Sequence, residues 1–397
     1  MTARWLRDER VLAALVQLVV AAVVAAVGMW LVLGVLADLR ARGIAPGFSF
    51  LGQTAGFGIG EGLAFQPTDS YGRALAVGLA NTLRVAVAGI ALATALGFVV
   101  ALARLSHNPL LEGLARAFID AMRNTPLSIQ LVLWIGLLRT LPPITQAMAL
   151  FPAAAATATA PDPPTAWLLL SLKGAAIAWP RPLPGAGGWL AAAAGAVAAG
   201  IAVRRWRSHV RDRTGAPAHH GVWTVAVLAS SAALAWAVLG PPAAWDLPRV
   251  EGPFRYAGGY VTTPEFAALL FGLVVYTGAF IAEVVRSGIQ SVGIGQREAA
   301  RALGLTEGTV LRLVVLPQAL RVIVPPMTNQ YLNLTKNSSL AIIIGFPDLF
   351  SVGQTVGNQT GQVVAVVAIV MAVYLGISLL TSLVLNAYGR SVRLIER

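Results

Sequence analysis

Long apolar stretches alternate with short polar or charged segments along the whole chain. A helix needs about 20 predominantly apolar residues to cross the ~30 Å hydrocarbon core of a bilayer. The stretches that we expect to cross a membrane are 11–37, 74–103, 109–139, 189–203, 222–240, 265–286, 320–345 and 362–388. The pattern therefore predicts an all-α polytopic membrane protein with about 8 transmembrane helices.

Composition supports a membrane protein. Hydrophobic residues make up 57% of the chain and charged residues 12%, whereas soluble domains carry about 25% charged residues. The chain has no cysteine, which excludes disulfides and thiolate chemistry. Its net charge of +12 comes from arginines that gather in the segments predicted to lie inside, in accord with the positive-inside rule. We therefore expect both termini in the cytoplasm and no nucleic-acid partner.

The middle of the chain reads as an insertion. Residues 166–180 carry Trp167 and Trp179 near their ends and Lys173 between them, and are too short to span. We expect an interfacial or re-entrant piece there, followed by a hairpin of the spans 189–203 and 222–240. The predicted divisions are an N-terminal anchor with a periplasmic segment (1–73), a first core part (74–149), the insertion (150–264) and a second core part (265–397).

One polar segment between two spans has a distinctive spacing. Glu298, Ala299 and Ala300 are followed by Gly304 and, further on, by Leu316 and Pro317. Residues 297–303 favour a short helix that Gly304 ends, since glycine suits the position after a helix terminus. The small Ala299, Ala300 and Ala302 would let this helix seat closely in a partner, with Arg297 and Glu298 at its rim. The alternative is an ordinary amphipathic loop.

Polar side chains within the apolar stretches are the candidates for a solute path, because they are costly in a membrane. Lys336 lies ~22 Å along a helix from Arg321. The other candidates are Asn337, Ser338, Ser339, Arg123, Thr125, Pro126, Gln130 and Glu283. Pro126 should break its helix, and Glu283 could simply pair with Arg286 or Arg123. Arg84 is expected to extend toward the membrane surface, with solute contact as the alternative.

These motifs together resemble a known family. Arg123-Asn124-Thr125-Pro126-Leu127, the Glu298-Ala299-Ala300 segment and Lys336-Asn337-Ser338-Ser339-Leu340 resemble the polar amino-acid branch of type I ABC importer permeases. The extra N-terminal span and the insertion are similar to the larger permease subunit of general L-amino-acid importers. The resemblance covers about residues 74–390. It implies a five-helix core and, at about 290–320, the "EAA" coupling loop.

The resemblance also implies partners. They are a second permease subunit, two copies of a cytoplasmic ATPase and a periplasmic solute-binding protein, with an L-amino acid as substrate in the bacterial inner membrane. No phosphate-binding G-x-x-x-x-G-K-[ST] motif occurs in the sequence. ATP and Mg are thus expected on the ATPase, with no cofactor or metal and no catalytic residue on this chain. The alternatives are a secondary transporter and an intramembrane enzyme.

The predicted topology can be tested with reporter fusions. A fusion near Arg207 should report the cytoplasm, because the arginine-rich turn between the two hairpin spans should be retained inside. Fusions near Asp162 and Asp246 should report the periplasm. External labelling of the Arg207 site would contradict the hairpin assignment.

Overall fold

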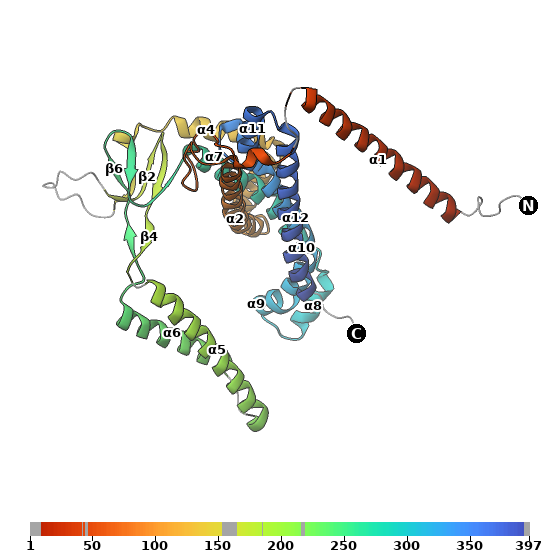
Figure 1. Cartoon of the computed structure of the whole chain (residues 1–397). Helices are drawn as coiled ribbons and strands as arrows, with labels where there is room; N and C mark the ends of the chain where they lie inside the picture. Colours follow the sequence, from red (N-terminus) through yellow and green to blue (C-terminus); the bar gives the residue numbers. More distant parts are fainter. Residues whose placement is uncertain are drawn as a thin grey trace, which may run out of the picture. The chain divides into compact units, whose positions relative to one another are not determined.

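The computed structural model of the chain describes residues 9–41, 43, 47–152, 165–184, 186–215 and 219–392 (Figure 1). These residues form two compact units. One comprises Met1–Trp134 with Ala268–Arg397, and the other comprises Ile135–Ala267. The described residues do not include Asp162, one of the proposed reporter sites. They also do not include four arginines near the termini that count toward the predicted orientation: Arg4, Arg7, Arg393 and Arg397.

The first unit is helical. Its elements, with those that cross the unit boundary, are α1 (Glu9–Ala41), η2 (Ser49–Gly52), α2 (Tyr71–Arg104), α3 (Pro109–Asn124), α4 (Leu127–Arg139), α7 (Pro264–Gln290), α8 (Ile294–Ala302), α9 (Glu307–Val310), the π-helical turn η4 (Leu311–Val315), α10 (Leu316–Asn337), the 3-10 helix η5 (Ser338–Ile344), α11 (Leu349–Thr360) and α12 (Val363–Val392). Among the described residues, seven helices are long and apolar enough to cross a membrane. Each of them overlaps a predicted span.

The predicted span 109–139 does not form one long helix. It consists of two helices, α3 and α4, which are separated at Thr125 and Pro126. α4 is apolar but has 13 residues, and α3 carries Glu112 and Arg116 on an exposed face. The break follows from Pro126, which disfavours helical backbone at the residue before it, as the sequence predicts.

A short helix that the sequence analysis did not anticipate completes the core. α11 packs against α2 and α12, and its Leu349, Val352 and Val356 are buried. The approach to α2 is close, because a Cβ at Gly78 would lie 3.0 Å from the Leu349 Cα atom. The segment before α2 contributes Phe50 and other apolar side chains to the same cluster.

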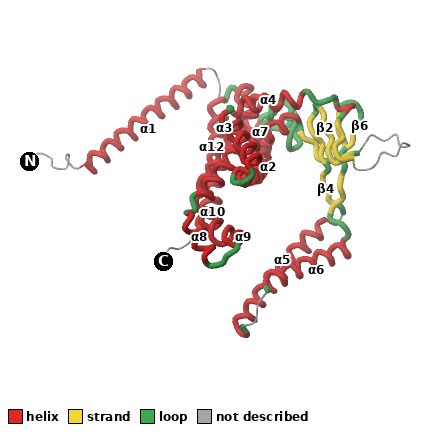
Figure 2. The backbone as a smooth tube through the Cα atoms, turned by 180° about the vertical axis from the view of Figure 1, so that it is seen from behind, coloured by secondary structure: helices red, strands yellow, loops and turns green. Residues whose placement is uncertain are grey.

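The second unit contains all the described strands. A four-stranded antiparallel sheet has the order β1 (Met148–Pro152), β2 (Ala166–Ser171), β3 (Gly174–Ile177) and β8 (Tyr260–Thr262). Two ribbons pair β4 (Trp179–Pro182) with β5 (Ala243–Asp246) and β6 (Arg249–Glu251) with β7 (Arg255–Ala257). α5 (Ala186–Thr214) and α6 (His220–Leu239) run side by side as a hairpin (Figure 2).

Residues 166–180, for which we expected an interfacial or re-entrant piece, form β2, β3 and the start of β4. Within β2, Ala166, Leu169 and Ser171 are buried, whereas Trp167 is exposed. Leu172 and Lys173 form the turn to β3, whose first residue, Gly174, has φ +109°. A short apolar run does not by itself distinguish a strand from a buried helix, so the sequence pattern did not predict these strands.

The contact between α2 and α7 depends on a missing side chain. A Cβ at Gly97 would lie 2.4 Å from Ile281 Cγ2 and 3.0 Å from the Gly278 carbonyl oxygen. Gly97→Ala should therefore lower the free energy of unfolding by about 1–3 kcal/mol through overpacking, measured by thermal unfolding of the purified protein. Gly113→Ala in α3 is the matched control, because nothing lies within 4 Å of its Cβ position. Equal unfolding midpoints in the two variants would contradict this account.

Candidate functional site: an exposed loop and a polar groove

The loop between α7 and α10 forms two short helices joined by a tight turn. α8 ends in a Schellman motif, in which Leu305 N–H donates to the Ala300 carbonyl (3.3 Å) and Gly304 N–H donates to the Arg301 carbonyl (2.8 Å). Gly304 has φ +76°, so the prediction that glycine ends this helix is confirmed. Thr306 occupies the N-cap position of α9, but its hydroxyl contacts Thr309 Oγ1 (2.9 Å) and no backbone N–H.

The predicted docking residues lie on different sides of this loop. Glu298 and Ala299 are exposed, whereas Ala300 is buried. Arg297 is half-buried, because its guanidinium donates to the Ile289 carbonyl (2.6 Å) at the end of α7. The expectation that Ala300 faces a partner is therefore wrong, and its small side chain instead lets α8 pack close to the rest of the loop. Leu316 is exposed, and Pro317 follows it at the start of α10.

Two large apolar side chains on this loop were missed by the sequence analysis. Leu303 is 81% exposed and Ile294 is 72% exposed. They flank the helix that carries Glu298, and Arg301 forms an ion pair with Glu307 beside them (Nε–Oε1 2.6 Å). Apolar residues within an otherwise polar loop were the available signal. Both side chains are thus exposed at the two ends of α8.

The helix break at Thr125 and Pro126 is closed by the chain itself. The Gln130 side-chain amide donates to the Met122 carbonyl (2.9 Å) and to the Thr125 carbonyl (3.0 Å). The Thr125 hydroxyl donates to the Ala121 carbonyl (2.9 Å). Gln130 is only 3% exposed, so it satisfies the carbonyls freed by the break and does not line the groove described below.

Two further candidate path residues have structural contacts. Glu283 accepts hydrogen bonds from Arg286, with 3.0 Å between Arg286 Nε and Glu283 Oε2. The Arg123 guanidinium lies 5.2 Å from the centre of the Phe280 ring. Glu283 is therefore paired within its own helix, as the alternative reading of the sequence proposed.

Arg84 pairs with a segment outside the helices. Its Nη2 lies 2.6 Å from Glu61 Oε1, and Glu61 is 8% exposed. Beside it the Asn81 amide donates to the Glu61 carbonyl (3.2 Å) and the Pro347 carbonyl (2.9 Å). This ion pair holds the segment that precedes α2 against the helix, a contact that the sequence did not predict.

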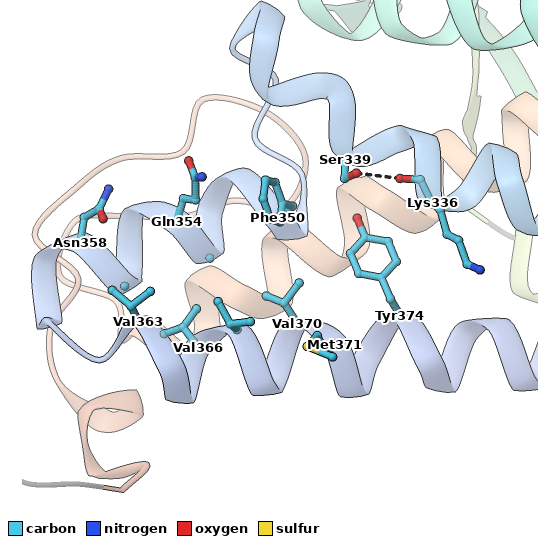
Figure 3. A pocket seen from close by; sticks show the side chains of 13 residues that line it. Lys336, Ser339, Phe350, Gln354, Asn358, Val363, Val366, Val370, Met371 and Tyr374 are labelled. Carbon is cyan, nitrogen blue, oxygen red and sulfur yellow. Dashed lines mark hydrogen bonds between the residues drawn. The ribbon is translucent and has the colours of Figure 1, made fainter. Parts of the chain in front are cut away.

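Lys336 and Ser339 line a groove of about 590 Å³ between the end of α10, η5, α11 and α12 (Figure 3). Lys336 lies at one end of the row of lining side chains and Asn358 at the other. Gln354 joins Asn358 on α11, and α12 supplies an apolar wall of valines with Met371. The groove thus combines one cationic side chain and two amides with an apolar surface, which is the usual character of a small-molecule site.

The other two members of the predicted polar cluster do not line this groove. Ser338 is fully buried and its hydroxyl donates to the Thr335 carbonyl (2.7 Å). Asn337 is half-buried and lies outside the lining set. Of the four consecutive residues, only Lys336 and Ser339 line this groove, because helical geometry turns neighbouring side chains to different sides.

Asp348 fixes the start of α11 and so one wall of the groove. Its carboxylate accepts the Ser351 N–H (2.8 Å) and the hydroxyl of Tyr374 (3.2 Å), a lining residue. Complete burial raises the pKa of the Asp348 carboxyl to about 6, although its hydrogen bonds favour the charged form. Gln354 and Asn358 were missed because no element was predicted for 349–360, and Tyr374 was missed because it lies within the apolar span predicted at 362–388.

The long apolar helices and the exposed loop between α7 and α10 define a polytopic helical membrane protein. Residues 258–394 match the family described as binding-protein-dependent transport system inner membrane component. The protein YhdX of Escherichia coli (strain K12) is 43% identical over 95% of this chain and 93% of YhdX. The general L-amino acid transport system permease protein AapQ of Rhizobium johnstonii is 41% identical over 93% of this chain and 89% of AapQ.

A third relative extends the same agreement. The glutamate/glutamine/aspartate/asparagine transport system permease protein BztB of Rhodobacter capsulatus is 36% identical over 98% of this chain and 96% of BztB. The chain therefore belongs to the family of ABC transporter permeases of the inner membrane, and the resemblance drawn from its sequence is confirmed. It is an integral inner-membrane transport subunit.

The geometry of α8 generates a test of the loop. Glu298→Arg reverses an exposed charge, and Gly304→Pro removes both the positive φ and the N–H that closes the helix. Each variant should reduce solute uptake at least tenfold while membrane insertion is unchanged. Gly308→Ala in α9 is the control, since its Cβ position is open. Solute uptake at the wild-type rate in both variants would refute the hypothesis that this loop docks to a partner subunit.

Proposed function

We propose that this chain is the permease subunit of an ATP-driven importer of polar or general L-amino acids. The observation that carries this proposal is its identity with AapQ and BztB over nearly the full length of each chain. The exposed helix α8, flanked by Leu303 and Ile294, supports it because such a surface fits a cleft on another subunit.

The partners follow from the same proposal. Two copies of a cytoplasmic ATPase bind the coupling loops and hold ATP and Mg, so that hydrolysis takes place outside this chain. A second permease subunit completes the path, and a periplasmic binding protein delivers the solute. The N- and C-termini then lie in the cytoplasm. Residues 74–149 and 265–397 form the core, residues 1–73 the anchor with its periplasmic segment, and residues 150–264 the insertion.

The mechanism is alternating access. ATP on the ATPase and loaded binding protein at the periplasmic side each favour one of two global states, and the solute crosses as the states exchange. α10 extends from the coupling loop to Lys336, with Pro325 and Pro326 within it, so a displacement of the loop reaches the groove through this one helix.

The groove supplies the solute contact in this proposal. Lys336 attracts the solute carboxylate, Ser339 and the amides of Gln354 and Asn358 offer hydrogen bonds, and the apolar wall accepts side chains of several kinds. A cation at such depth costs about 2.5–3.5 kcal/mol on insertion scales, so a compensating interaction is expected.

The complex of this chain with its partners provides the test of function. After reconstitution, amino-acid-loaded binding protein should stimulate ATP hydrolysis and drive uptake. Uptake that needs no ATPase would instead identify a secondary transporter and refute the proposal.

Lys336→Met isolates the role of the groove, because methionine keeps much of the stem and removes the charge. Uptake should fall at least tenfold, while docking of the binding protein and basal ATP hydrolysis persist. Leu332→Met, on the same helix outside the lining set, is the control. Wild-type uptake of all amino acids by Lys336→Met would show that the path lies elsewhere.

A further inference from the structure

The end of α5 carries a concentrated positive charge that the transport proposal does not use. Within residues 204–213 there are five arginines and one acidic residue, Asp212, which gives a net charge of +4. Asp212 lies beside Arg211, with 3.3 Å between Nε and Oδ1. The sequence of residues 214–220 adds no acidic side chain.

Two tryptophans indicate the depth of this cluster in the membrane. Trp206 is 60% exposed and Trp223, in the first turn of α6, is 47% exposed. The Arg207 guanidinium lies 5.4 Å from the centre of the Trp223 ring and 6.0 Å from that of Trp206. Exposed tryptophans gather where the hydrocarbon core meets the headgroups. The apolar part of α5 also ends at Val203, directly before the first arginine.

Three of the arginines share one face of the helix. Arg204, Arg207 and Arg211 follow the i, i+3, i+7 spacing that places side chains above one another. A guanidinium is planar and can stack on an aromatic ring while its N–H groups bind a phosphate in a bidentate manner. Arg207 has this stacked arrangement on Trp223.

We propose that Arg204, Arg207 and Arg211, together with Trp206 and Trp223, bind the phosphate headgroup of an anionic phospholipid. The lipid belongs to the bilayer that the α5–α6 hairpin crosses. This choice of partner follows from position, because the arginines begin where the apolar helix ends and lipid phosphates are concentrated at that depth. The site is independent of the transported solute and gives the inserted hairpin a role as a lipid anchor.

The experiment uses the intact complex in mild detergent, equilibrated with equimolar phosphatidylglycerol and phosphatidylcholine. Native mass spectrometry then gives the ratio of the two bound lipids. The triple variant Arg204→Gln/Arg207→Gln/Arg211→Gln should lower the phosphatidylglycerol preference about tenfold. The corresponding triple lysine variant should lose part of the preference, since lysine keeps the charge but not the planar fork.

Arg181→Gln/Arg249→Gln/Arg255→Gln is the matched control, because it removes the same charge from exposed strands of the same unit. It should keep the wild-type lipid ratio, and an equal loss in both triple variants would overturn the site. A reporter at Gly215 verifies the topology of each variant. Arg207→Gln removes the stacked guanidinium but keeps four arginines in the cluster. A wild-type lipid ratio both in this variant and in the triple lysine variant would show that charge alone is sufficient, and would also overturn the proposed site. Preferential binding of a short RNA, without any preference between the two lipids, would also overturn the proposed lipid site.

Discussion

The structure depends on one constraint: within a membrane, every backbone N–H and C=O must find a partner inside the protein. Continuous helices meet it without help. At two places where the described chain departs from a helix, polar side chains supply the missing partners. Gln130 bonds to the carbonyls at the Thr125–Pro126 break, and the Thr82 hydroxyl accepts the Leu349 N–H (3.0 Å) at the start of α11. Asp348 accepts a further N–H in the same turn.

This constraint separates two kinds of polar residue that look alike in a sequence. Gln130, Ser338 and Thr82 are buried and form hydrogen bonds with the backbone, so their polar groups stabilise the fold. Lys336, Gln354 and Asn358 line a groove instead. Only the second kind is available for a solute. Polarity at membrane depth is therefore a weak indicator of a path until the backbone contacts are known.

The sequence was sufficient for features that local chemistry controls. The apolar stretches located the long helices, and Gly304 located the end of α8 because only glycine adopts its φ without cost. The sequence was insufficient for features that depend on contacts with residues elsewhere in the chain. The strands at 166–177 owe their form to pairing with β1 and β8, and Ala300 is buried through contacts of a loop that folds on itself. Arg84 and Glu61 are 23 residues apart, and no periodicity connects them.

α10 connects the exposed loop to the groove, and its own sequence shapes how it can move. A helix of 22 residues spans ~33 Å. Pro325 and Pro326 lie within it, and each removes one backbone hydrogen bond from the ladder. The turn that these prolines weaken therefore divides α10 into two parts. The first part begins at the coupling loop and would move with a docked ATPase, and the second part carries Lys336. In our proposal the lower part of α10 follows the coupling loop, while flexing at these prolines sets how far the groove reorients.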